Sequence, residues 1–223
     1  MKIVGLTGSI GMGKSTTAAM LRRLKIPVFD ADAEVHRLMA PRGSAVAAVL
    51  EAFPGVGNDK GGIDRKKLGA AVFGDTPALR RLEAILHPRV HVARQALLKA
   101  CARRRAAIVV LDVPLLFEGG GDRACDAVLL ATTSAMVQRQ RVLARPGMTE
   151  TQFRQILGRQ VPDAVKRRRT PYIVETGLGK RYALMRLRDY IRALELNGKA
   201  GSWGRDARNR VRYGNHRARS RKR

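Results

Sequence analysis

The chain has 223 residues, 45% of them hydrophobic, which is enough for one generous domain or for a core domain with inserted subdomains. Its formal net charge of +26 indicates anionic partners, such as nucleotides, nucleic acid or acidic surfaces. The two cysteines have no metal-ligand spacing, and no apolar run predicts a signal peptide or a membrane span of ~20 residues, so we expect a cytoplasmic protein without membrane contact.

Five short apolar runs, each bounded by turn signals, predict buried parallel strands. They are residues 2–7, 26–29, 107–111, 127–132 and 172–174. Apolar residues at helical spacing separate or follow them, most clearly at 15–24 and 181–196. Strands that alternate with helices predict an α/β fold with a doubly wound parallel sheet of five strands.

Two long intervals between the strands predict inserted structure. Residues 33–106 are too many for one crossover helix and predict a helical insertion, interrupted by the Gly-rich stretch 53–62. Residues 139–170 are rich in arginine and lack a strand pattern, which predicts a second insertion. The last segment, 198–223, is strongly basic and almost free of aliphatic residues, so we predict a disordered tail there.

The stretch GSIGMGKST, residues 8–16, lies between the first predicted strand and the first predicted helix. It satisfies the spacing G-x-x-x-x-G-K-[ST] of a P-loop. Glycines let the backbone wrap around an anion, and the N–H groups of the loop and of the helix start then point at phosphates. We expect nucleoside-triphosphate binding, with Lys14 on the outer phosphates and the Ser15 hydroxyl on Mg²⁺. The predicted nucleotide-binding residues are Gly8, Gly11, Met12, Gly13, Lys14, Ser15 and Thr16.

Two aspartates, Asp30 and Asp32, follow the second predicted strand at the edge of the sheet where ligands bind in such folds. A carboxylate there can orient and deprotonate an acceptor hydroxyl for attack on a γ-phosphate. The alternative is structural: Asp32 caps a helix that starts at Ala33, and Asp30 is a solvated turn residue. Spacing alone leaves both interpretations open.

Six segments occur in order and at sensible intervals, and together they resemble the dephospho-coenzyme A kinase family. They are VGLTGSIGMGKST, IPVFDADAEVHRLM, GGIDRKKLGAAVF, LEAILHP, VPLLFE and QRQRVLAR. The resemblance runs from about Lys2 to about Leu196, and the segments after the P-loop make it narrow. It implies transfer of the γ-phosphoryl group of ATP, with Mg²⁺, to the ribose 3′-hydroxyl of dephospho-coenzyme A, the last step of coenzyme A synthesis.

The resemblance also implies a division of the chain into a P-loop NTPase core, a helical substrate-binding insertion and a lid. The core would comprise 1–32, 107–138 and 171–197, the insertion, together with part of the core, 33–106, and the lid 139–170. The oligomeric expectation is a monomer or a weak oligomer.

Roles for single residues follow from the same resemblance. Asp32 falls on the proposed catalytic base, and Arg141, which closes the Q-x-x-R pattern, falls beside the transferring phosphoryl group. Arg145 would face the same side at i+4 spacing. In the acceptor region, Arg65 could pair with the substrate's pyrophosphate, and His87 could contact substrate or make a structural hydrogen bond. Because His87 precedes a proline, we expect the helix to end or kink there.

Several positions have no settled role. Asp112 sits where a Walker B acid could hold Mg²⁺ through water, and Glu118 could lie near the acceptor site. Leu115 and Leu116 are expected in the core. Ser9 and Met12 replace smaller residues that the family commonly has in the loop, without removing an essential side chain. Thr170-Pro171 replaces the usual Ala-Asp before the last strand, which calls into question any adenine or lid contact made through that Asp.

Two other functions remain open at this stage. A P-loop kinase could act on another small-molecule acceptor. Alternatively, the charge and the basic tail, with Trp203 and Tyr213 among arginines, could serve an ATP-dependent nucleic-acid-binding protein. The tail could also add weak, sequence-independent nucleic-acid contact to a kinase.

Overall fold

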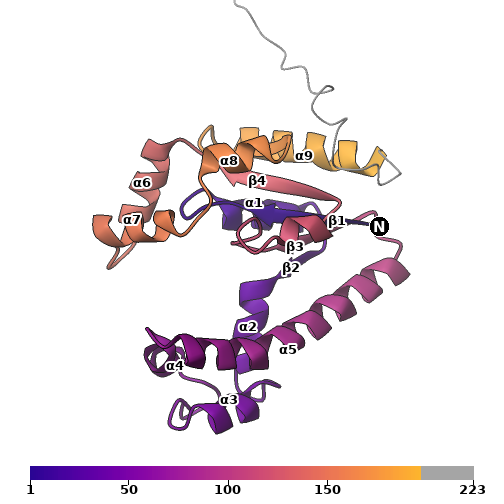
Figure 1. Cartoon of the computed structure of the whole chain (residues 1–223). Coiled ribbons are helices and arrows are strands. Elements are labelled where there is room, and N and C mark those ends of the chain that lie inside the picture. Colours follow the sequence, from indigo (N-terminus) through magenta and orange to yellow (C-terminus); the bar gives the residue numbers. More distant parts are fainter. Residues whose placement is uncertain (197–223) are drawn as a thin grey trace, which may run out of the picture.

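The computed structural model describes residues 1–196, which form a five-stranded sheet flanked by helices (Figure 1). All strand pairs are parallel, in the order β2-β3-β1-β4-β5. The strands are β1 (Lys2–Thr7), β2 (Val28–Asp30), β3 (Ile108–Asp112), β4 (Ala127–Thr132) and β5 (Tyr172–Glu175). The predicted α/β fold with a parallel five-stranded sheet is confirmed, and β2 is shifted to begin at Val28 and to include Asp30.

The strands on either side of β1 are buried along their whole length, because parallel sheets are covered on both faces, and β1 itself is buried from Val4 to Thr7. Every residue of β3 and β4 is buried. Helices α1 (Lys14–Arg23) and α9 (Lys180–Leu196) cover one face, where their apolar side chains share one core with side chains of four strands. Residues of the opposite face, such as Val128, pack against the segment after β3, including Leu116 and Phe117.

That segment corrects one expectation. Leu116 is buried as predicted, but the neighbouring Leu115 is 50% exposed rather than part of the core. The reason is local. The strand β3 ends at Asp112, and the chain then continues toward the short 3₁₀ helix η1 (Gly121–Ala124). Leu115 therefore lies outside the sheet, where helices no longer cover both faces of the backbone.

A second core lies outside the sheet, in the helices between β2 and β3. These are α2 (Ala31–Met39), α3 (Val46–Ala52), α4 (Arg65–Val72) and α5 (Thr76–Arg103). Their inward side chains form a separate apolar cluster that includes Leu38, Val49, Leu68 and Leu82. In Figure 1 α2 leads from the sheet to this group, and α5 returns from it toward β3.

Helix α5 corrects the expectation at Pro88. Of the two outcomes expected at this proline, an end to the helix is wrong, because α5 continues through Pro88 as one element of 28 residues. A proline removes one backbone donor from an interior turn, a loss that packing can outweigh. Here Leu82 and Leu86 on the preceding turns are buried in the helical core.

The third group of helices follows β4: α6 (Ala135–Leu143), α7 (Glu150–Gly158) and α8 (Asp163–Arg168). A capping box between Thr149 and Gln152 starts α7, and Glu150 joins it to α6 through an ion pair with Arg139 at 2.9 Å. Within residues 1–196, no helix combines the length and apolar character needed to cross a membrane. The predicted tail, 198–223, lies outside the described residues.

Candidate active site

The phosphate-binding loop lies between β1 and α1. Several of its positions must be glycine, because neighbouring atoms leave no room for a side chain. Gly13 is the N-cap of α1 with φ of 87°, a left-handed conformation that other residues rarely adopt. A Cβ on Gly13 would lie 2.6 Å from the Thr176 hydroxyl, and one on Gly8 would lie 2.6 Å from the carbonyl oxygen of Ala131. The backbone of the loop is thus held against two neighbouring strand ends.

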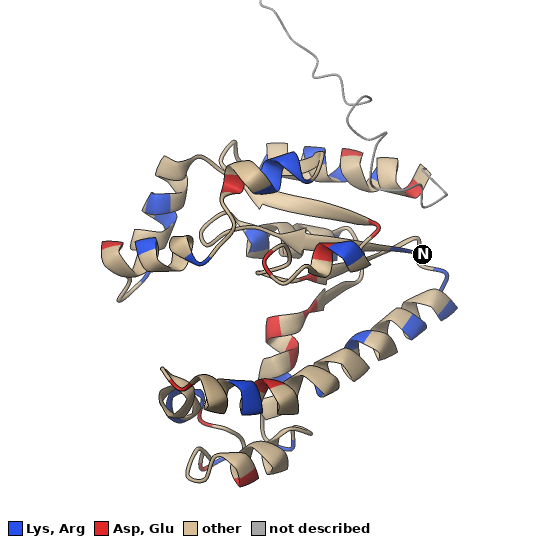
Figure 2. Ribbon diagram, in the orientation of Figure 1, with Lys and Arg blue, Asp and Glu red and all other residues tan. Residues whose placement is uncertain are grey.

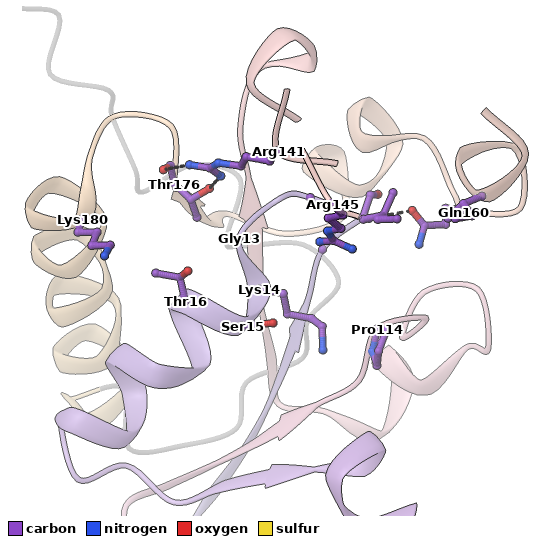
Figure 3. A pocket seen from close by; sticks show the side chains of 15 residues that line it. Gly13, Lys14, Ser15, Thr16, Pro114, Arg141, Arg145, Gln160, Thr176 and Lys180 are labelled. Carbon is purple, nitrogen blue, oxygen red and sulfur yellow. Dashed lines mark hydrogen bonds between the residues drawn. The ribbon is translucent and has the colours of Figure 1, made fainter. Parts of the chain in front are cut away.

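This loop forms one wall of a cavity of about 610 Å³ (Figure 3). Eight residues predicted for nucleotide binding or phosphoryl transfer line it: Gly8, Gly11, Gly13, Lys14, Ser15, Thr16, Arg141 and Arg145. Arg145 was expected to follow Arg141 at i+4 spacing on one helix. This is wrong, because α6 ends at Leu143 and Arg145 follows the C-cap. The structure nevertheless brings both arginines to the same cavity as the loop.

Lys14 is paired at the floor of the site with Asp112, the last residue of β3. Its Nζ lies 2.7 Å from Asp112 Oδ1, and the Asp112 side chain is only 3% exposed. Burial raises the pKa of the Asp112 carboxyl above its ordinary value, although the hydrogen bond and charge of Lys14 oppose this. The position suggested by sequence for a Walker B acid therefore holds a carboxylate in direct contact with the P-loop lysine.

Arg141 is held by a residue that the sequence analysis missed, Thr176, directly after β5. The guanidinium of Arg141 donates to the Thr176 hydroxyl and to its carbonyl oxygen, each at 2.8 Å. The Thr176 hydroxyl in turn donates to the carbonyl oxygen of Met12 at 2.8 Å. Thr176 therefore connects α6 to the phosphate-binding loop, and both it and Lys180 line the cavity (Figure 3).

Two glutamines hold the backbone of Ile10 in the same loop. The Gln138 amide donates to the carbonyl oxygen of Ile10 at 2.8 Å, and the Ile10 N–H donates to Gln160 Oε1 at 3.1 Å. Gln138 belongs to the Q-x-x-R pattern, whereas Gln160 follows α7 and carried no sequence signal. Both polar backbone groups of Ile10 are thus satisfied by side chains from opposite ends of the α6–α7 region.

Met12, predicted as a nucleotide-binding residue, does not line the cavity. Its side chain is 3% exposed and points into the protein, where its sulfur accepts from the Thr133 N–H at 3.2 Å. Thr170, at the departure before the last strand, is also turned inward: its hydroxyl donates to the Val128 carbonyl and accepts from the Tyr172 N–H. The side chain of Thr170 therefore serves the sheet rather than the cavity.

The two aspartates after β2 have different environments. Asp30 is the N-cap of α2: it accepts from the Ala33 N–H at 3.0 Å and pairs with Arg22 at 3.2 Å. The structural alternative had assigned the cap to Asp32, which is wrong, since α2 begins at Ala31. Asp32 is an exposed residue of the first helical turn, and no hydrogen bond or ion pair to the rest of the described chain engages its carboxylate.

The register of the sheet relates this helix to the phosphate-binding loop. Asp30 is paired with Asp112 between β2 and β3, and Asp112 contacts Lys14. Helix α2 therefore starts at the same carboxyl edge of the sheet as the loop, although Asp32 does not line the cavity. Figure 2 shows acidic residues on the part of α2 next to the sheet and basic residues on α6, α7 and α8.

The predicted acceptor residues lie on the surface of the helices that form the second core. Arg65 begins α4, and its guanidinium hydrogen-bonds to the ring of His36 on α2. His36 is four residues after Asp32, so the two share a helix face and Arg65 reaches the face that carries Asp32. His87 is an exposed residue of α5. Neither Arg65 nor His87 lines the cavity.

A divalent cation would find few ligands from the chain alone. Residues 1–196 contain no group of three or more His, Cys, Asp or Glu side chains that could hold a metal ion. Mg²⁺ usually binds through one or two protein ligands together with substrate phosphates. The Ser15 hydroxyl in the cavity, with Asp112 on the adjacent strand, fits that mode of binding.

Comparisons with known proteins identify what this arrangement resembles. A family model described as dephospho-CoA kinase matches residues 2–179. The dephospho-CoA kinase of Rhodospirillum rubrum is 59% identical over 186 residues, which are 83% of this chain and 88% of that protein. That of Mesorhizobium japonicum is 52% identical over 205 residues, 91% of this chain and 100% of that protein.

Solved structures agree in fold. A crystal structure from Thermus thermophilus has a TM-score of 0.70 with 35% identity, and the match covers 86% of this chain and 96% of that one. The dephospho-CoA kinase of Campylobacter jejuni has a TM-score of 0.62 over 86% of this chain and 97% of that one. At 18% identity, the second likeness shows the fold alone.

Proposed function

The chain belongs to the dephospho-CoA kinase family, and from this premise we propose that it transfers the γ-phosphoryl group of ATP to the ribose 3′-hydroxyl of dephospho-CoA. The products are CoA and ADP. The observation that carries the proposal is the cavity itself, where the P-loop, Lys14, Arg141 and Arg145 meet at one edge of the sheet. Backbone N–H groups at the start of a helix, with lysine and arginine side chains around them, are suited to bind a triphosphate.

The donor side of the reaction is assigned to the cavity residues. Lys14 leaves its contact with Asp112 to reach the outer phosphates, and Arg141 and Arg145 donate to oxygens of the transferred group. The Ser15 hydroxyl, together with phosphate oxygens, would hold Mg²⁺, which would supply further positive charge against the charge of the transition state. The second insertion, 139–170, serves as the lid over this side.

The acceptor side is assigned to α2 and the helices beyond it. Asp32 orients the ribose 3′-hydroxyl and accepts its proton as the 3′-oxygen forms its bond to the γ-phosphorus and the bond to ADP breaks. A carboxylate without a partner in the described chain is suited to this role, whereas Asp30 is engaged as a helix cap. Arg65, beside the same face of α2, would bind the substrate's pyrophosphate. His87 and the insertion 33–106 complete the acceptor site.

The experiment that tests the proposal is an acceptor assay with the purified full-length protein, ATP and Mg²⁺. We expect conversion of dephospho-CoA to CoA with equimolar ADP, and no comparable turnover of a nucleoside monophosphate or of shikimate. The matched control is Lys14→Ala, which should abolish turnover of every acceptor. Robust turnover of one of the other acceptors, with none of dephospho-CoA, would assign the chain to a different small-molecule kinase.

Three further expectations stay predictions. We expect the chain to be a monomer or a weak oligomer and to be located in the cytoplasm, as suits a biosynthetic kinase. Nucleic-acid contact through the basic tail concerns residues 198–223, which lie outside the described residues.

A further inference from the structure

A buried lysine on α8 contacts the phosphate-binding loop from behind. Lys166 is fully buried, with 0% of its side chain exposed. Its Nζ lies 2.9 Å from Glu118 Oε1 and donates to the Ser9 hydroxyl at 3.2 Å. Ser9 belongs to the loop and lines the cavity. The lysine thus joins the loop to Glu118, a residue without an assigned role.

Burial of an ammonium group is costly unless it is paired and hydrogen-bonded, so the contacts of Lys166 need to be well ordered. Glu118 meets this need. Burial alone would raise the pKa of its carboxyl, but hydrogen bonds from Lys166 and from backbone N–H groups outweigh burial and hold the pKa below its usual range. Glu118 therefore remains ionised near neutral pH and acts as the counter-ion of Lys166.

The helix that carries Lys166 is itself fixed to the sheet. Asp163 accepts from the Thr132 hydroxyl at 2.9 Å, and Arg167 donates to Asp163 at 2.7 Å and to Glu175 at 2.8 Å. These contacts join α8 to the ends of β4 and β5. Because α8 is attached on both sides of Lys166, the ammonium is presented to the loop from a defined position.

The geometry points to Lys166 as a positioning residue for ATP binding, acting through the Ser9 hydroxyl and supported by Glu118. This inference rests on the proposed function only in naming ATP as the nucleotide. A loop that binds phosphates through backbone N–H groups gains affinity when it is already fixed in the bound conformation. Lys166 fixes Ser9, as the two glutamines fix the next residue, Ile10.

The decisive variant is Ser9→Ala. It removes the hydroxyl that accepts the hydrogen bond from Lys166 and leaves the Lys166–Glu118 ion pair intact. We expect a three- to tenfold weaker affinity for a non-hydrolysable ATP analogue, measured by calorimetry. The KM for ATP should rise by a similar factor, while the KM for dephospho-CoA and the melting temperature change little. An unchanged analogue affinity for Ser9→Ala would overturn the inference.

A second comparison separates positioning from direct contact between Ser9 and the nucleotide. The double variant Lys166→Met/Glu118→Leu removes both charges without leaving either one buried alone. The double variant should weaken analogue binding by a similar factor. Adding Ser9→Ala to the double variant should cause little further loss, because the interaction between Lys166 and Ser9 is already absent. Losses that multiply would show that Ser9 acts independently of Lys166. The matched control is Arg168→Met, an exposed residue of the same helix, which should bind the analogue normally.

Because these measurements use an ATP analogue without acceptor, they are independent of the acceptor assay. Failure to phosphorylate dephospho-CoA would refute the proposed function and leave the role of Lys166 intact.

Discussion

Thr176 offers the sharpest test of how the cavity is assembled, because one hydroxyl joins two parts of it. The hydroxyl accepts from Arg141 and donates to the carbonyl oxygen of Met12, both at 2.8 Å. The variant Thr176→Val keeps the shape of the side chain and removes both contacts. The second bond from Arg141, to the Thr176 carbonyl oxygen, is retained.

The magnitude follows from these two bonds. A neutral hydrogen bond contributes about 0.5–1.5 kcal/mol net. The bond from the exposed Arg141 is screened by solvent and contributes about 0.5–1 kcal/mol. Together they predict a loss of about 1–2.5 kcal/mol, which corresponds to a five- to sixtyfold fall in kcat/KM for ATP at roughly 1.4 kcal/mol per tenfold.

Steady-state kinetics with varied ATP, at saturating dephospho-CoA, measure this loss directly. Thr176→Ser is the matched control, since it keeps the hydroxyl and should remain within about twofold of the native protein. The reasoning would be refuted if the valine variant matched the native protein, or if the serine variant lost as much as the valine variant.

Three further predictions concern other parts of the molecule. Asp32→Asn should lower kcat by at least ~100-fold with little change in ATP affinity, as seen by single-turnover kinetics and calorimetry, and equal losses in both would remove Asp32 as the base. Gly13→Ala should lower the free energy of unfolding by about 1–2 kcal/mol and weaken ATP binding, because of its φ of 87° and the contact with Thr176. In denaturant titrations Gly158→Ala, a helical position with open space around it, should be neutral or stabilising, and a similar loss in both variants would contradict the steric argument. Burial raises the pKa of Cys125 from 9.0 to about 11, so peptide mapping at pH 8 should show it alkylated about 100-fold more slowly in the folded than in the unfolded chain. Equal rates would contradict the raised pKa of this half-buried thiol.

The parts of the site that sequence could predict are those specified by neighbouring residues. The P-loop has a fixed local spacing, and a buried parallel strand is a continuous apolar run, so both could be recognised from short segments. Arg141 and Arg145 line the same cavity as the P-loop, although the helix that was expected to align them ends at Leu143, and their role in phosphoryl transfer stays a prediction.

The parts that sequence could not predict depend on contacts between distant segments. Thr176 is 164 residues from Met12 and Lys166 is 157 residues from Ser9, and neither pair has a spacing that could reveal it. The assignment of the helix cap failed for a different reason. Aspartate is favoured both as a cap and as a base at the end of a strand, so residue type alone could not distinguish Asp30 from Asp32.

The direct junction between β2 and α2 has a consequence for how such a protein can change its acceptor. Helix α2 begins one residue after the strand ends, and Asp30 is tied to both α1 and α2, so the first turn of α2 is oriented by the sheet. The helices farther along have a hydrophobic core of their own. Because we assign the acceptor site to these helices, we expect substitutions in their core to alter which alcohol is bound while the sheet keeps the orientation of the first turn of α2. Under that proposal, the residues that bind the phosphoryl donor and those that select the acceptor can change independently.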